Sequence, residues 1–354
     1  MNHFQPQPAG LPSGSFGGRR GAAIAAPSLR RLLAAPHRLA FAAGSVLLVA
    51  AALWWAGVQL APALGRPLPL LLSADDGFAW LLALGAWPLF LAGLLCAALP
   101  RWLGCPPLAA RLLLAPLGAV AGGWALTLFG LHTGHLAAAL GLAAVAVGLA
   151  LLAGLVGLTW LEHRYHAAGP TPAPAAAAGL VVLAVAAWGG AVSLALGQPQ
   201  WLHAALQGAL WLGLVPLAAA LLHADGRTLA PAGSRLGWLQ RSTWAWLGTA
   251  AGLDLVWTDA APAAPLLLGC LGSLVMARAT TELLQQANRR PCIDNTVWFS
   301  AIAAQLAALA ATLAPLWPAG GQPLALLAAQ FWLGAVALWA WHLRPGLLRL
   351  PTGA

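Results

Sequence analysis

The chain has 354 residues, of which 61% are hydrophobic and only 7% are charged, and its mean hydropathy is +0.80. Soluble domains carry about 25% charged residues, so this composition excludes an ordinary water-soluble fold. All 17 basic residues are arginines, spread along the chain between apolar runs, and this distribution excludes nucleic acid as a partner because it forms no single basic face.

The N-terminal residues 1–36 are rich in Gly, Pro, Gln and Ser. Such segments bury too little apolar surface to fold, so we expect a disordered, basic cytoplasmic tail here. The first long apolar run starts near Leu39 and is long enough to span a membrane. That length favours a retained first helix over a cleaved signal peptide.

Ten apolar runs follow, most of them near the length of about 20 residues that a helix needs to cross a bilayer. They cover residues 39–62, 78–99, 112–131, 136–160, 176–196, 203–222, 243–258, 264–282, 296–316 and 323–343. The seventh run is short. The runs do not alternate apolar with polar residues, which excludes a transmembrane barrel. The predicted fold is all-α, a polytopic transmembrane bundle of about ten spans over residues 37–345, with a short cytoplasmic tail at 346–354.

The arginines assign a side of the membrane to each connection, because cytoplasmic loops are enriched in them. With the N-terminus in the cytoplasm, 16 of the 17 arginines fall in cytoplasmic segments and only Arg66 falls outside. Omitting the seventh span would move five later arginines to the outer side. We therefore predict an even number of spans and cytoplasmic N- and C-termini, with the lipid bilayer as the partner that the composition identifies.

Two histidines in the stretch LFGLHTGHLAAAL are the first candidates for a binding site. His132 and His135 lie between the third and fourth spans, and His203 begins the sixth span at the same predicted outer depth. Ligands of one metal must lie at one depth, so these three form a candidate set for haem or a metal. Thr133 and Gly134 equally suit the caps of a turn between two helices. We interpret the stretch first as a capped turn and second as half of a site.

A second group of histidines lies at the predicted inner face, beside arginines: His37, His163, His166, His223 and His342. Side chains in this position are expected at the level of anionic headgroups. Asp254, about one turn inside the outer end of the seventh span, is the deepest acidic residue. An ionisable group inside a span is a functional candidate by default. Walker A, HExxH and G-x-S-x-G motifs are absent, so the sequence indicates no class of enzyme.

Several stretches resemble the NnrS family. They are AAPHRLAFAAGSVLLVAAALWW at the first span, FLAGLLCAALPRWLGCPPL at the second, LGLVPLAAALLHADGRTLAP at the sixth and RRPCIDNTVWFSAIAAQLAAL near the ninth. The resemblance implies a multi-pass protein of the bacterial inner membrane, associated with the nitric-oxide and denitrification response and containing haem or copper. The family's histidine motifs are absent, since SADDGFAWLLALG stands where Trp-His-x-His-Glu-Met is usual. No metal-binding residue is therefore carried over.

Two other functions remain open. Ten spans could form two inverted repeats of five helices, as in transporters of small molecules or ions, where the first and sixth spans are broken and polar. The scarcity of polar residues inside the spans also fits a non-catalytic membrane scaffold or assembly partner.

Overall fold

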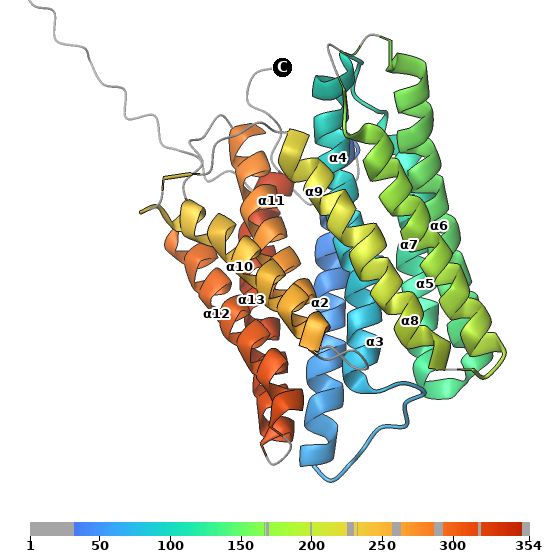
Figure 1. The fold of residues 1–354 in the computed structure, drawn as a ribbon, viewed down its shortest axis with the longest axis vertical. Coiled ribbons are helices and arrows are strands. Elements are labelled where there is room, and N and C mark those ends of the chain that lie inside the picture. Colours follow the sequence, from blue (N-terminus) through green and yellow to red (C-terminus); the bar gives the residue numbers. More distant parts are fainter. Residues whose placement is uncertain are drawn as a thin grey trace, which may run out of the picture.

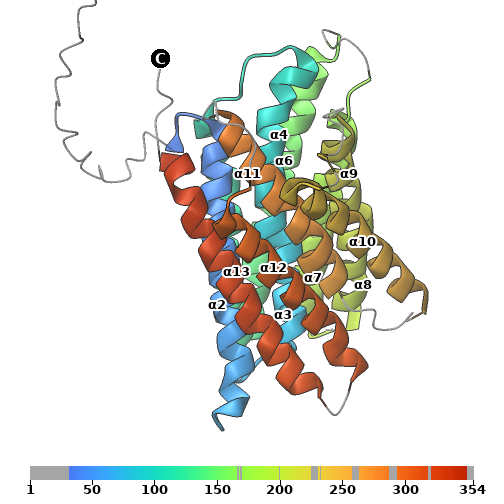
Figure 2. The ribbon, with the colours of Figure 1, turned by 90° about the vertical axis from the view of Figure 1, so that its left-hand side faces the viewer.

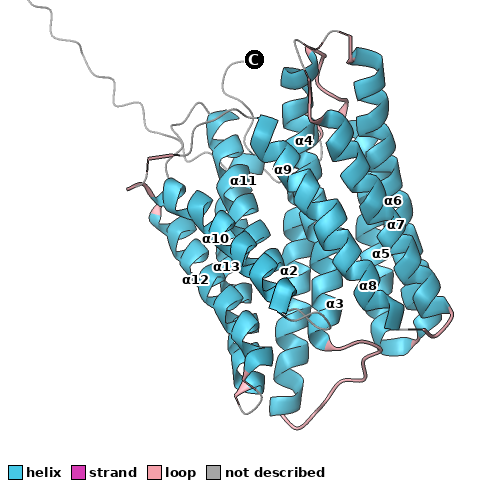
Figure 3. Cartoon of the chain, viewed as in Figure 1, coloured by secondary structure: helices cyan, strands magenta, loops and turns pink. Residues whose placement is uncertain are grey.

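A computed structural model describes residues 32–165, 167, 170–198, 200–224, 230–231, 233–256, 263–286, 293–317 and 320–348, without the side chains of residues 200, 203, 223, 224, 286 and 348. Within these residues the chain is helical and contains no strand (Figure 3). Nine helical stretches of the described chain are long and apolar enough to cross a membrane. The predicted all-α helical bundle is therefore confirmed.

The helical segments in chain order are α2 Pro36–Ala63, α3 Ala74–Leu81, η1 Leu82–Ala86, α4 Trp87–Leu103, η2 Ala110–Leu113, α5 Leu114–Thr133, α6 His135–His163, α7 Ala173–Ala195, α8 Gln200–Gly208, η3 Ala209–Leu214, α9 Val215–Ala224, α10 Arg235–Val256, η4 Pro265–Leu271, α11 Gly272–Gln286, α12 Asn295–Leu313, η5 Ala314–Leu316 and α13 Gly321–Leu348. Segments η1, η3 and η4 are π-helical, and η2 and η5 are 3₁₀ helices.

The helices pack side by side as a bundle (Figures 1 and 2). Neighbours in sequence form hairpins, with α5 on α6, α6 on α7 and α12 on α13, while α2 packs against both α4 and α13. The span made of α3, η1 and α4 is central, since 94% of its most apolar 18-residue stretch is buried, whereas the corresponding share for α13 is 39%. The outer helices leave apolar side chains exposed, and a bilayer is the solvent that such a surface requires.

Helix α10 is the seventh helix, and its composition falls short of that of a membrane span. It has 22 residues and begins at Arg235, eight residues before the predicted start of the seventh span at residue 243. It packs against η4 and α11, which follow it in the chain (Figure 1). In the described part of the chain, only the other nine helical stretches are long and apolar enough to cross a membrane. The count of ten spans and the sides of the termini therefore stay predictions.

Hydrogen bonds between side chains hold α10 against its neighbours. The indole N–H of Trp246 in α10 donates to Oε1 of Gln305 in α12. The Gln305 amide in turn donates to the hydroxyl of Ser273 in α11 at 2.7 Å, and Ser242 of α10 donates to the same hydroxyl at 3.1 Å. Between helices in lipid, such bonds supply attraction that apolar contact alone does not. This network joins the relatively polar α10 to two other helices of the bundle, α11 and α12.

Replacement of Gln305 by leucine tests the network. Gln305→Leu removes two of its bonds and leaves the Trp246 indole without an acceptor, so we expect the free energy of unfolding to fall by about 1–2 kcal/mol. Unfolding by SDS in mixed micelles measures this change. Gln330→Leu is the control, because Gln330 is exposed on α13 and its loss leaves stability unchanged. Equal stability of the two variants would contradict a role for the network.

Candidate functional site

A cavity of about 470 Å³ lies at one end of the bundle, between α2, α3, α8, η4, η5 and α13. Its polar lining consists of Gln59, Asp75, Asp76, Gln207 and Gln322, and most of the remaining lining is apolar. Small-molecule sites have this character, with volumes of about 300–1,000 Å³ and a few polar groups on apolar walls. We name it the outer cavity, because the arginine distribution predicts that this end faces outward.

The start of α3 positions the two carboxylates of the outer cavity. Ser73 is the N-cap of α3, where its hydroxyl accepts the backbone N–H of Asp76 at 3.1 Å and donates to Asp76 Oδ2 at 2.7 Å. The Ser73 hydroxyl therefore caps the helix and fixes the Asp76 carboxylate at the same time. Asp75 and Asp76 both occupy the first turn of the helix, where the helix dipole stabilises negative charge.

Asp75 connects α3 to α2. Its Oδ1 accepts hydrogen bonds from Trp55 Nε1 at 2.9 Å and from Gln59 Nε2 at 2.8 Å. The Trp55 ring is itself fixed by stacking on Phe78, with ring centroids 4.1 Å apart. No described residue donates a hydrogen bond to Oδ2, and the residue is exposed. One oxygen of the carboxylate is therefore anchored and the other is available to a ligand.

The two carboxylates have no positive partner in the described chain. No described arginine or histidine nitrogen lies within 4.0 Å of Asp75 or Asp76. Arg66, in the connection between α2 and α3, is exposed. Two neighbouring uncompensated carboxylates create a negative potential in a partly apolar cavity, which attracts positively charged ligands.

The floor of the outer cavity consists of helices that lose their regular pitch. Leu82 is the first residue of η1, Leu267 and Leu268 belong to η4, and Gln207 precedes η3 by two residues. π-Helical turns are rare and frequently occur at functional sites. Two such turns, η1 and η4, line the cavity, and η3 begins two residues after the lining residue Gln207, so the floor is the second component of the candidate site.

The three π-helical segments share a sequence pattern. Residues 82–88 read LALGAWP, residues 210–216 read LWLGLVP, and residues 266–272 read LLLGCLG. The common pattern is L-x-L-G-x-x-P in the first two and L-x-L-G-x-x-G in the third. This internal repeat is the signal by which the sequence could have located the floor of the cavity, and the sequence analysis missed it.

Proline explains the π-helical turns of η1 and η3. The backbone N–H of Trp87 donates to the carbonyl of Leu82, five residues back, and Val215 donates to Leu210 in the same way. In each case the next residue is proline, which has no N–H to donate and whose ring crowds the carbonyl four residues before it. The turn before the proline therefore widens.

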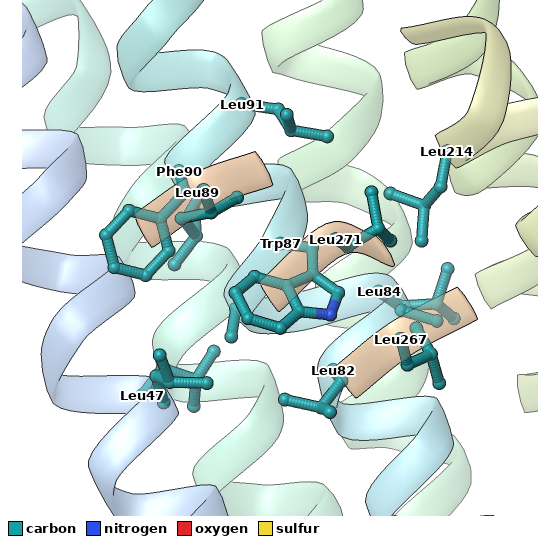
Figure 4. Packing of buried hydrophobic residues seen from close by; sticks show 14 of the residues in the cluster. Leu47, Leu82, Leu84, Trp87, Leu89, Phe90, Leu91, Leu214, Leu267 and Leu271 are labelled. Carbon is teal, nitrogen blue, oxygen red and sulfur yellow. The ribbon is translucent and has the colours of Figure 1, made fainter. Parts of the chain in front are cut away.

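An apolar plug closes the bundle on the side of the floor that faces away from the cavity (Figure 4). It consists of Leu84, Trp87, Leu214 and Leu271. Each of these side chains is at most 1% exposed. Beyond the plug, a void of about 20 Å³ lined partly by Leu91 has room for a single water molecule. The second span advances nine residues from Leu82 to Leu91, which corresponds to roughly 13 Å along a helix. The outer cavity therefore does not continue through the bundle.

Two tryptophans in and beside the plug have unsatisfied polar groups. Trp87 and Trp332 pack edge to face with ring centroids 6.2 Å apart, and neither indole N–H has an acceptor among the described residues. A buried, unpaired N–H costs about 1–3 kcal/mol.

His132 holds three segments together. Its Nε2 accepts a hydrogen bond from Trp54 Nε1 at 3.0 Å, so the proton of the neutral ring is on Nδ1, which donates to the carbonyl of Pro69 at 3.0 Å. Helix α5 ends at Thr133 and α6 begins at His135, which agrees with the interpretation of the stretch as a turn. Both ring nitrogens of His132 are occupied, so the residue can bind a metal only after losing one of these bonds.

The structure gives no joint site to the other predicted residues. His135 is exposed, and the side chain of His203 lies outside the described residues. Asp254 is partly exposed in the last turn of α10 and is not part of the outer cavity lining. The described residues contain no group of three or more His, Cys, Asp or Glu side chains that could hold a metal.

The inner histidines are similarly dispersed. His342 Nδ1 lies 3.3 Å from Asp294 Oδ2, and His163 Nδ1 is 3.1 Å from the carbonyl of Thr159 in its own helix. His37 lines a different cavity, at the opposite end from Asp75. His166 and the side chain of His223 lie outside the described residues.

No protein-family model, curated protein or solved structure matches the chain. The resemblance to NnrS proteins therefore stays a prediction, as do haem and copper binding.

The glycine of the repeated pattern can be tested in η1. A Cβ atom added at Gly85 would lie 2.6 Å from Trp124 Nε1 and 2.8 Å from a methyl group of Leu47. Gly85→Ala is therefore expected to lower the free energy of unfolding by about 1–3 kcal/mol. Gly57→Ala serves as the control, since no atom lies within 4 Å of its added Cβ, and SDS unfolding should show no loss. A stable Gly85→Ala variant would contradict the tight packing of η1.

The role of His132 can be separated from metal binding. His132→Phe keeps an aromatic ring but removes both hydrogen bonds, so we expect a loss of about 1–2 kcal/mol in stability and an unchanged visible spectrum of the purified protein. The exposed His135→Phe should change neither property. A Soret band in the wild type that disappears in His132→Phe would instead establish His132 as a haem ligand.

Proposed function

We propose that the protein is a multi-pass membrane transporter that takes a small, positively charged solute from the outer cavity. The observation that carries this proposal is Asp75, an uncompensated carboxylate anchored through one oxygen inside a cavity that is lined in part by the π-helical segments η1 and η4. The negative charge of the cavity favours a cationic solute, and the π-helical turns in its floor favour transport.

A positive charge on the solute is favoured by the cavity lining. Asp75 and Asp76 supply two carboxylates, and the side chains of Gln59, Gln207 and Gln322 supply amides. An anion would meet two like charges here, whereas a cation gains a charge-assisted hydrogen bond to the free oxygen of Asp75. The amide groups suit a solute that also carries hydrogen-bonding groups.

Transport is favoured because the cavity ends on a barrier of interrupted helices. Solute sites in many transporters lie at broken helices, whose irregular backbone is tolerated only where protein or a cavity covers it. Here the plug separates the outer cavity from the opposite end, where Arg101 Nη1 and Glu282 Oε2 lie 3.9 Å apart. A cavity open at the end that holds Asp75 and closed toward Arg101 fits a transporter with access from one side.

The other predicted functions receive less support. The inverted-repeat transporter would have breaks in its first and sixth spans, whereas α2 is continuous from Pro36 to Ala63 and the breaks fall in the second, sixth and eighth apolar runs. A scaffold function does not account for an acidic cavity. The role in the nitric-oxide response and the location in a bacterial inner membrane rest on the NnrS resemblance alone and stay predictions.

Asp75→Asn tests the solute site. Asparagine keeps the oxygen that accepts from Trp55 and Gln59, so the variant should fold while losing the charge. The probes are radiolabelled methyl-, ethyl- and propylammonium, a size series of small cations whose N–H groups can donate to the free oxygen of Asp75. We expect saturable binding of at least one probe to the purified protein, and binding at least ten-fold weaker in Asp75→Asn, as loss of a charged contact implies.

Glu162→Gln is the matched control, since this exposed carboxylate lies near the end of α6, away from the outer cavity. It should bind the probe like the wild type. Absence of saturable binding for all three probes, or equal loss in both variants, would overturn the cation site. Uptake of the bound probe into proteoliposomes is the second measurement, and binding without uptake would overturn transport while leaving the binding site in place.

A further inference from the structure

A second cavity lies at the opposite end of the bundle from Asp75. It has a volume of about 760 Å³ and is lined by residues 33–38 at the start of α2, by the second half of α4, by residues 107–111 and by Glu282 of α11. The segment η2 packs against α2 at this point. We name it the inner cavity, because the arginine distribution predicts that this end faces the cytoplasm.

Positive groups from two separate elements line the inner cavity. Arg38, in the first turn of α2, is only 7% exposed, whereas Arg111 of η2 is exposed. His37 adds a third basic side chain. The acidic residue of the lining is Glu282, and it lies 3.9 Å from Arg101, outside the cavity lining. The charge balance of the cavity therefore favours an anion.

The start of α2 adds to this preference. Its N-cap residue, Ala35, provides no side-chain cap, and the first turn of the helix contains no acidic residue. Ala35 and Pro36 both line the inner cavity. A helix N-terminus carries a partial positive charge and free N–H groups, which bind anions when no acidic side chain occupies them.

The walls of the inner cavity are apolar. Leu33, Ala97, Pro100, Pro107 and Leu108 supply them. A free phosphate ion requires no such surface, whereas a phospholipid has a glycerol backbone and acyl chains to place beside its phosphate. Anionic lipids bind in basic pockets between helices on the cytoplasmic side of membrane proteins.

The N-terminal tail of the chain is a poor occupant of the inner cavity. Residues 1–31 contain four arginines and no acidic residue, so their charge has the same sign as that of the lining arginines. The charge of residues 1–31 therefore does not complement that of the inner cavity.

We propose that the inner cavity binds one molecule of an anionic phospholipid, with its phosphate at Arg38 and Arg111 and its glycerol and upper acyl carbons on the apolar walls. This site is separate from the proposed solute site in location and in the sign of its charge. The two proposals can therefore fail independently.

Native mass spectrometry of the purified protein tests this site with two lipids of identical acyl chains, dioleoylphosphatidylglycerol and dioleoylphosphatidylcholine. We expect one phosphatidylglycerol to bind more tightly than phosphatidylcholine. Arg111→Gln should weaken that lipid about five-fold, the effect of one interfacial arginine on anionic lipid. Arg38→Gln should weaken it further, and if this buried substitution prevents folding, the exposed Arg111→Gln decides the question.

Arg344→Gln is the matched control, because Arg344 is an exposed arginine of α13 that stacks on Trp341 and does not line the cavity. It should leave the affinity unchanged. Equal binding of the two lipids, or equal weakening by Arg111→Gln and Arg344→Gln, would overturn the proposal. Competition by glycerol 3-phosphate at the same concentration as the lipid would also overturn it, since it would identify a soluble phosphate as the ligand.

Discussion

The constraint on which this structure depends is the missing backbone donor of two prolines in the centre of the bundle. Pro88 and Pro216 cannot complete a regular helical turn, and an apolar interior offers no water to replace the lost bond. The residues before them adopt five-residue hydrogen bonds instead. The central helices therefore widen beside the outer cavity, and the leucines of the widened turns, with Trp87, close the path beyond it.

The two ends of the bundle, on either side of this barrier, differ in the sign of their charge. One end presents Asp75 and Asp76, which have no positive partner among the described residues, and the other presents Arg38 and Arg111 around a second cavity. Between them the interior is almost wholly apolar, so each cavity keeps its own potential. The proposed cation site and the proposed lipid site thus follow from one asymmetric distribution of charge along the bundle.

Helix α10 shows why sequence patterns predicted the helices better than their borders. Its first turns carry Arg235, Gln240 and Arg241, so an apolar window begins the span at residue 243 although the helix begins at Arg235. The bonds of Ser242 and Trp246 to neighbouring helices offset this polarity, and those partners lie far along the chain. For the same reason, the partners of His132 on α2 and at Pro69 could not be deduced from the stretch around it.

Local hydropathy and the residues that end helices are enough to predict the helical bundle, the nine apolar helices of the described chain and the turn at Gly134. The sequence also contained the repeated L-x-L-G-x-x-P pattern, whose prolines act on the turn immediately before them. Tertiary packing brings η1 and η4 to one cavity and places Trp55 and Gln59 beside Asp75. Those outcomes depend on how helices pack, and in lipid a span's apolar pattern does not specify which neighbour it takes.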